Sequence, residues 1–215
     1  MKKVFLSLLV IFVAASAFGQ SRDPKAKAIL DQVSAKFRSY KSVTAGFTYN
    51  ITNKAGKVLS NKKGTAVLKG DKYNISFDGN KIISDGRTVW NYDPSAKEVT
   101  VSNANKSEST ITPQKLFSDF YNKDFNYVLD KDFTVSGKAA HKIMLTPVDK
   151  KKPFERVYLG VDKATKNIVN IMVVEKSGNR YSYNVSSFRP NTSVSDAQFT
   201  FNRASYPGVE VVDLR

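Results

Sequence analysis

Residues 82–94, with the sequence IISDGRTVWNYDP, decide the fold of this chain. Apolar residues flank the pair Asp85-Gly86, and this pair supplies the positive φ that a two-residue hairpin needs. Asp93-Pro94 closes a second turn, and the strand between the two turns carries Trp90, the only tryptophan of the chain. The segment offers no general base, no nucleophile and no set of metal ligands. It therefore predicts a β-hairpin without catalytic groups.

Residues 1–19 have the pattern of a secretory signal peptide. Two lysines precede an apolar run at residues 4–13, which is too short to span a bilayer, and small residues follow it. Cleavage is expected before Gln20, with a site after Ala17 as the alternative, and an uncleaved membrane anchor is the competing interpretation. The predicted organisation is a signal peptide followed by one domain at residues 20–215, with the exported product in the periplasm.

The composition is basic and contains no cysteine. There are 34 Lys and Arg against 19 Asp and Glu, which gives a net charge of +15. Export and the scatter of the lysines argue against a nucleic-acid partner, and the one dense run, Lys150-Lys151-Lys152, is typical of a hairpin tip. A solvated surface explains the charge, and attraction to anionic lipid headgroups or to an acidic docking partner is the alternative. Cysteine-based catalysis and cysteine-ligated metal are excluded.

Hydrophobic periodicity predicts a helix followed by a large antiparallel sheet. Asp23-Pro24 has the N-cap and first-turn residues of a helix. Its apolar face would consist of Ala26, Ile29, Leu30, Val33, Phe37 and Tyr40. From Val43 the period changes to two, and short strands recur to Val101. Thr112-Pro113 predicts a second, short helix before strands resume at Phe125. The expected class is α+β, mainly β, with a curled sheet that encloses a packed core or a cavity.

Groups able to do chemistry are scarce. His141 is the only histidine, and a structural role is expected for it because no Ser or Asp stands in a recognisable triad context. Asp130 and Asp132 lack the spacing of a calcium loop, and no glycine-rich phosphate loop occurs. We therefore expect no catalytic residues, no metal site and no cofactor, and we predict that the protein is not an enzyme.

The chain resembles the outer-membrane lipoprotein carrier family (LolA-type), which are periplasmic lipoprotein chaperones. The resemblance covers essentially the whole mature chain and rests on an ordered set of segments. These are the amphipathic helix followed by residues 42–48 (SVTAGFT), the hairpin at 83–94, Thr112-Pro113 with its helix, and the end of the chain at 196–213. The resemblance implies a single-domain, unclosed antiparallel β-barrel of about 10–11 strands, with helices as a lid over an apolar cavity.

The resemblance also implies the function and the partners. An inner-membrane ATP-binding-cassette transporter would release acylated lipoproteins to this carrier, which would ferry them across the periplasm of a Gram-negative bacterium to an unknown outer-membrane acceptor. A monomer is expected. The alternatives are an envelope-stress sensor or regulator on a related fold, a carrier of another lipid or hydrophobic pigment, and an uncharacterised hydrolase.

The lining of the cavity is expected from apolar residues of the early strands and of the lid helices. The strands would contribute Phe47, Tyr49, Tyr73, Ile75, Phe77, Val89 and Trp90, and the helices Leu30, Val33, Phe37, Leu116, Phe117 and Phe120. The alternative for each of them is simple packing against the others. Val89 and Trp90 are neighbours on one strand and point to opposite faces, so at most one of them can face the cavity unless the strand bulges.

One departure from the family pattern concerns the lid. Many members have an arginine followed by proline after the third strand-like segment, and that arginine bonds the lid closed. Gly70 stands at the matching place here. Lys69 or Lys72 could substitute, but lysine lacks the planar fork of arginine. A weaker or different latch is expected.

Overall fold

The computed structural model describes residues 22–104 and 120–215. The predicted signal peptide at residues 1–19 lies outside this range, as do Thr112-Pro113, Leu116 and Phe117. Phe120 begins helix α3, but its side chain lies outside the description.

The described residues form twelve strands, two α-helices and two short 3-10 helices. The helical elements are α1 (Pro24–Arg38), α3 (Phe120–Asp124), η2 (Asp196–Phe199) and η3 (Arg203–Ser205). The strands are β1 (Val43–Thr52), β2 (Val58–Lys69), β3 (Lys72–Phe77), β4 (Asn80–Ser84), β5 (Thr88–Asp93), β6 (Glu98–Asn103), β7 (Phe125–Val135), β8 (Lys138–Pro147), β9 (Phe154–Asp162), β10 (Ile168–Glu175), β11 (Arg180–Pro190) and β12 (Glu210–Asp213).

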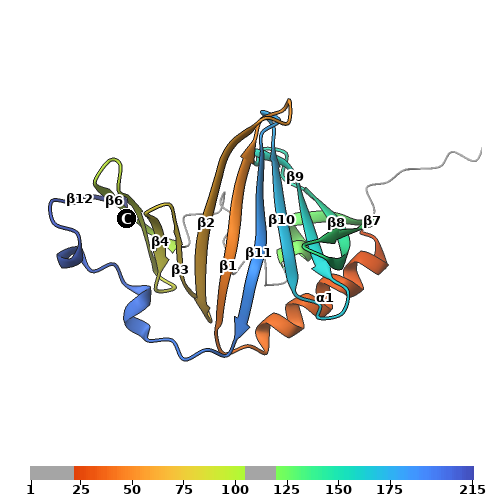
Figure 1. Ribbon diagram of the computed structural model, residues 1–215, viewed down its shortest axis with the longest axis horizontal. Coiled ribbons are helices and arrows are strands. Elements are labelled where there is room, and N and C mark those ends of the chain that lie inside the picture. The colour runs from red at the N-terminus through yellow and green to blue at the C-terminus, as the bar shows by residue number, and fades with distance from the viewer. Residues whose placement is uncertain (1–21, 105–119) are drawn as a thin grey trace, which may run out of the picture.

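All twelve strands belong to one sheet that does not close. Its order is β12-β6-β5-β4-β3-β2-β1-β11-β10-β9-β8-β7, so β12 and β7 are its edges. Nearly all neighbours pair antiparallel, but β12 runs parallel to β6. The long-range pairing of β1 with β11 joins the first six strands to the last group (Figure 1). The unclosed, mainly β architecture predicted from the sequence is confirmed, with one or two strands more than expected.

Helix α1 packs into the largest cluster of buried residues in the described part of the chain. Asp23 caps it, and its carboxylate accepts the Lys25 amide at 2.8 Å and the Leu129 amide at 3.1 Å, so the cap also ties the helix to β7. Ala26, Leu30 and Val33 are buried against the β7–β10 half of the sheet. Phe37 and Tyr40, at the end of the predicted apolar face, pack instead against a smaller cluster on β1–β3.

The hairpin at residues 82–94 forms as predicted, with its first turn moved by one residue. The Asp85 amide donates to the Thr88 carbonyl at 3.3 Å, so Gly86 and Arg87 are the two central residues. Gly86 has a φ of 92°, while the Asp85 carboxylate accepts the amides of Arg87 and Thr88, each at 2.8 Å. Aspartate therefore fixes the turn through its side chain, and glycine alone supplies the positive φ.

The C-terminal segment after β11 covers the β3–β6 side of the sheet. Phe199 is fully buried, and the Asn74 side-chain amide donates to the Gln198 carbonyl at 2.7 Å. Further along, the rings of Phe201 and Tyr206 stack with centroids 4.6 Å apart, and both lie beside Tyr92. The segment then joins the sheet as β12 (Figure 1). It thereby occupies the face of β3–β5 opposite to the apolar cluster of Leu68 and Tyr73.

The cap of α1 makes stability depend on pH in a defined direction. The hydrogen bond from the Leu129 amide is the largest of the contacts that lower the pKa of Asp23 below its ordinary 3.8. A carboxyl with a lowered pKa stabilises the fold fully above its unfolded-state pKa, and loses that effect as the pH falls through the folded value.

We expect Asp23→Ala to lower the free energy of unfolding by about 1–2 kcal/mol at neutral pH. Urea denaturation at several pH values measures this. The gap between wild type and variant should persist down to about pH 4 and narrow below it. A gap that is equal at pH 3 and pH 7 would contradict the assignment.

Candidate lipid-binding cavity

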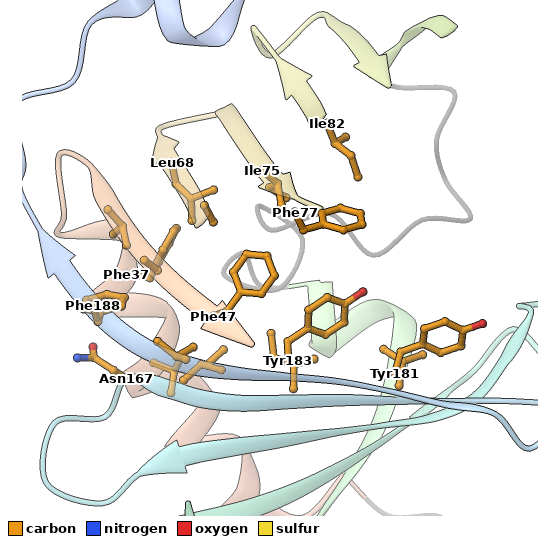
Figure 2. Close-up of a pocket in the computed structure, with 18 of the residues that line it drawn as sticks. Phe37, Phe47, Leu68, Ile75, Phe77, Ile82, Asn167, Tyr181, Tyr183 and Phe188 are labelled. Atoms are coloured by element: carbon orange, nitrogen blue, oxygen red, sulfur yellow. The ribbon is translucent and has the colours of Figure 1, made fainter. Parts of the chain in front are cut away.

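A cavity of about 470 Å³ lies inside the curl of the sheet. Its walls come from the end of α1, from β1–β4 and from β9–β11 with the turn that joins β9 to β10 (Figure 2). The lining residues are Val33, Phe37, Tyr40, Val43, Ala45, Phe47, Ala66, Leu68, Ile75, Phe77, Ile82, Phe154, Lys166, Asn167, Ile168, Ile171, Val173, Glu175, Tyr181, Tyr183, Val185 and Phe188. The volume falls within the range of about 300–1,000 Å³ that small-molecule sites occupy.

Strand register explains why one wall is aromatic. Tyr183 on β11 pairs with Tyr49 on β1, and their rings stack with centroids 4.9 Å apart. The Phe47 ring meets the Tyr183 ring edge-on at 6.0 Å. Gly46 pairs with Ser187 but Phe47 pairs with Val185, so Ser186 is left without a partner on β1 and forms a bulge in β11. Rings from two strands that are distant in the sequence therefore gather in the middle of the cavity (Figure 2).

Gly64 makes room for the Phe47 ring. It pairs with Phe47 across β1 and β2, and a Cβ on Gly64 would lie 2.4 Å from Phe47 Cζ and 2.7 Å from the Ser76 carbonyl oxygen. Real Cβ atoms do not approach other atoms this closely, so the ring lies directly over the glycine. The missing side chain leaves the space that the Phe47 ring occupies.

The charged lining residues are confined to the two ends of the cavity. Lys166 and Asn167 directly precede β10, where the Tyr40 hydroxyl bonds to Asn167, and Glu175 is the last residue of β10, beside Tyr181. Burial raises the pKa of Tyr183, and the same cause raises the pKa of Tyr49. The tyrosines therefore remain neutral, and the cavity presents rings and hydroxyl groups rather than charge along its length.

His141, the only histidine of the chain, lies outside the cavity. His141 lies on β8 and bonds through Nδ1 to Asp132 Oδ1 at 3.0 Å, and Lys163 also pairs with Asp132. None of these residues lines the cavity. Over residues 22–104 and 120–215, no group of three or more His, Asp or Glu could hold a metal ion. What the lining residues offer is a mainly apolar enclosure.

Five of the residues predicted to line the cavity do so. They are Val33 and Phe37 from α1, Phe47 from β1, and Ile75 and Phe77 from β3. Three others support the wall from behind or beside it. Leu30 lies in the core under α1, Tyr73 lies in the cluster with Val43 and Leu68, and Tyr49 stacks on lining rings. Leu116, Phe117 and the side chain of Phe120 lie outside the described residues.

Trp90 does not line the cavity, because alternate residues of β5 point to opposite faces of the sheet and Trp90 is on the outer face. Trp90 pairs with Ile83 and Val101, on the face that the C-terminal segment covers. Val89 pairs with Ser84 and packs against the cluster of Val43, Leu68 and Tyr73, beside the cavity. Of the two neighbours, Val89 is therefore the one on the inner face, and placing Trp90 in the lining was wrong.

Sequence reasoning missed the contribution of β10 and β11. These strands provide Ile171, Val173, Tyr181, Tyr183, Val185 and Phe188 to the lining. The period-two alternation of Tyr181, Tyr183 and Val185 was visible in the sequence and matches the alternation of Phe47 and Tyr49. The missing information was the pairing of β1 with β11, which places the two alternating faces side by side.

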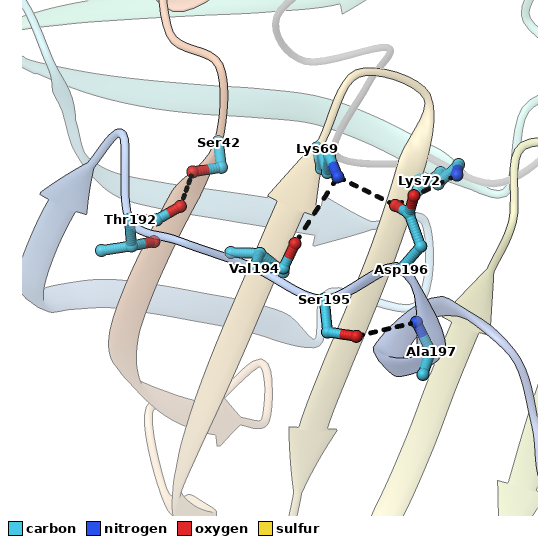
Figure 3. Close-up of polar contacts among 8 residues, drawn as sticks. All are labelled: Ser42, Lys69, Lys72, Thr192, Val194, Ser195, Asp196 and Ala197. Atoms are coloured by element: carbon cyan, nitrogen blue, oxygen red, sulfur yellow. Dashed lines mark hydrogen bonds and ion pairs between the residues drawn. The ribbon is translucent and has the colours of Figure 1, made fainter.

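The lysines that flank Gly70 bind the C-terminal segment. Lys69 Nζ lies 2.9 Å from Asp196 Oδ1, and Lys72 Nζ lies 3.2 Å from the same oxygen (Figure 3). Upstream, the Ser42 hydroxyl donates to the Thr192 carbonyl at 2.5 Å. The Lys69 ammonium thus binds the C-terminal segment, which crosses the sheet here. These contacts join the C-terminal segment to the β2–β3 turn, and the lid latch expected from the sequence stays a prediction.

The sequence profile of the family described as outer membrane lipoprotein carrier protein LolA matches residues 38–202. The chain belongs to the LolA family. An outer-membrane lipoprotein carrier protein of Aliivibrio salmonicida is 26% identical over 223 residues, covering 100% of both chains. A carrier of the same name from Xanthomonas campestris is 29% identical and covers 81% of this chain and 83% of its own.

A solved structure shares the fold of this chain. An uncharacterised conserved protein from Thermus thermophilus superposes with a TM-score of 0.58 at 14% identity, over 88% of this chain and 99% of that one. At this identity the likeness concerns the fold alone. Within the described residues, no helix combines the length and the apolar composition that crossing a membrane requires.

We expect Gly64→Ala to destabilise this LolA-family protein and to displace the Phe47 ring. The added methyl group meets both the ring and the Ser76 carbonyl oxygen, so it cannot be accommodated by the side chain alone. Overpacking of this kind costs about 1–3 kcal/mol. Thermal unfolding measures the effect, and Thr65→Ala, at the exposed next position of β2, is the matched control. Equal unfolding temperatures for both variants would contradict the close contact.

Proposed function

We propose that this protein binds the acyl chains of lipoproteins in the cavity and carries them across the periplasm. The apolar enclosure is the observation that carries the proposal: branched and aromatic side chains line about 470 Å³, and charge lies only at the ends. Membership of a family of periplasmic lipoprotein carriers supports the same function. The signal peptide predicted at residues 1–19 agrees with a periplasmic location.

The energetics of acyl transfer explain why a container is needed. Each methylene released into water costs about 0.8 kcal/mol, so a chain of ~16 carbons costs roughly 12 kcal/mol. Free diffusion of such a chain through the periplasm is negligible. Transfer from a bilayer into the cavity replaces one apolar environment with another and is close to neutral by the same reasoning.

A near-neutral transfer needs an external source of energy and a separate acceptor. We propose that an inner-membrane ATP-binding-cassette transporter delivers the lipoprotein and that a site at the outer membrane receives it. The protein contributes enclosure, and the nucleotide of the transporter drives extraction. The glycine-rich sequence of a phosphate-binding loop is absent from the chain, which agrees with this division of labour.

We expect Val185→Glu to weaken acyl binding at least tenfold. Val185 lines the cavity and is partly buried, so a carboxylate there would lose water when an acyl chain enters. Titration with a fluorescent fatty acid measures this. Ser186→Glu adds the same charge at the exposed next position, on the opposite face of β11, and should leave the affinity unchanged. If Val185→Glu binds the fatty acid as tightly as the wild type, the acyl chain does not bind in this cavity.

The transport role is tested by lipoprotein release. Spheroplasts that contain the transporter are incubated with the purified protein, and the supernatant is probed for lipoproteins. We expect release above a buffer control, and reduced release with Val185→Glu but not with Ser186→Glu. No release above buffer, with acyl binding intact, would mean that the protein carries a lipid other than a lipoprotein anchor.

A further inference from the structure

Three turns meet at one end of the sheet and form a continuous surface. They are residues 53–57 between β1 and β2, 148–153 between β8 and β9, and 176–179 between β10 and β11 (Figure 1). Lys176 Nζ donates to the Lys150 carbonyl at 2.6 Å, which joins the last two turns. A Cβ on Gly178 would lie 2.9 Å from Lys54 Cγ, so the third turn touches the first. Together with Val58, Leu59 and Arg180, we call these residues the tip surface.

The tip surface is strongly cationic. It carries seven cationic side chains and one acid, Asp149. The cations are Lys54, Lys57, Lys150, Lys151, Lys152, Lys176 and Arg180. The Asp149 carboxylate accepts the Lys151 amide at 2.8 Å, and its single charge leaves these residues with a net charge of +6 (7 − 1). Clusters of about four to eight such residues are typical of surfaces that bind anionic lipid headgroups.

Large apolar side chains stand exposed among these cations. Val58 is 58% exposed and Leu59 is 56% exposed, although both belong to a strand. Val148, which begins the turn after β8, is 50% exposed. A solvated surface needs charge but no exposed aliphatic groups, whereas insertion at a membrane interface uses both. The combination distinguishes the tip surface from the scattered lysines elsewhere.

The tip surface adjoins one end of the cavity. Tyr181 directly follows Arg180, and Glu175 directly precedes Lys176. Both Tyr181 and Glu175 line the cavity. An acyl chain that leaves by this end would emerge between the same turns that carry the cations. A membrane held against the tip surface would then receive the chain without its passage through water.

We propose that the tip surface docks this protein on the anionic surface of a lipid bilayer, with Val58 and Leu59 at the depth of the headgroups. The inference rests on the proposed carrier function, because docking gives the cavity contact with a source or a destination of acyl chains. The docking proposal is supported by the charge complementarity and by the exposed aliphatic groups. The nearby end of the cavity explains how docking would serve the transfer of an acyl chain.

The first experiment locates the contact. The chain has no cysteine, so Leu59→Cys can be labelled with an environment-sensitive fluorophore without background. Leu214→Cys, at a side chain 59% exposed just beyond β12, is the matched control. Vesicles of phosphatidylcholine with phosphatidylglycerol should shift the emission of the label at position 59 to the blue and leave that at position 214 unchanged. Equal responses at both positions, or none at either, would overturn the proposal.

The second experiment tests the charge. Each cation near an anionic membrane contributes roughly fivefold to binding. The double variant Lys54→Glu/Lys57→Glu should therefore bind phosphatidylglycerol-containing vesicles at least about 25-fold more weakly, and salt should weaken binding by the wild type. Lys41→Glu/Arg203→Glu makes the same change of net charge at exposed positions outside the tip surface and should bind like the wild type. Equal loss in both variants would show a net-charge effect and overturn the assignment to the tip.

Fatty-acid titration separates this inference from the proposed function. The tip variant should keep the wild-type affinity for a fluorescent fatty acid in solution, because none of its changed residues lines the cavity. If the wild type binds vesicles but no fatty acid, the carrier function fails and docking stands. If the tip variant loses lipoprotein release while vesicle binding is the same as in the wild type, the partner of the tip is an acidic protein and membrane docking is overturned.

Discussion

The packing of one helix against half of a very wide sheet is the constraint on which the rest of the structure depends. Leu30 and Val33 of α1 bury themselves on the β7–β10 half and complete a dense core there. Helix α1 has 15 residues and cannot cover all twelve strands. Among the described residues, the inner face of β1–β3 and β11 keeps rings and branched side chains that meet only partly, and the cavity is the space between them.

Local features of the fold could be predicted because they depend on neighbours in the sequence. The cap and proline at Asp23-Pro24, the alternation along residues 43–51 and the glycine turn at Gly86 follow from such neighbours, and all three appear in the structure. The lining needed more than this. The pairing of β1 with β11, which are far apart in the sequence, and the bulge at Ser186 of β11 decide which alternating faces meet. The alternation along a strand separates its two faces but does not show which of them is the inner face of the sheet. Trp90 was therefore assigned to the wrong face.

The role of Lys69 and Lys72 illustrates the same limit for charged groups. The sequence pointed to both because they flank the position where the family arginine was expected. Their partner Asp196 lies far beyond them in the sequence and belongs to a segment with no regular periodicity. An ion pair on an exposed surface contributes little stability by itself. Here it acts together with the Ser42–Thr192 and Asn74–Gln198 hydrogen bonds, which attach the same segment along its length.

An unclosed barrel has a cost that a closed one avoids, since it leaves two strands with unpaired backbone groups that could recruit a second chain. The two edges are blunted in different ways. The edge strand β12 has only four residues, which offers a short ladder to any partner. The edge strand β7 is long, but its register breaks between Asp130 and Phe133, and the interrupted stretch carries Lys131 and Asp132. Edges of this kind resist strand-to-strand polymerisation, which is the hazard that an unclosed sheet carries.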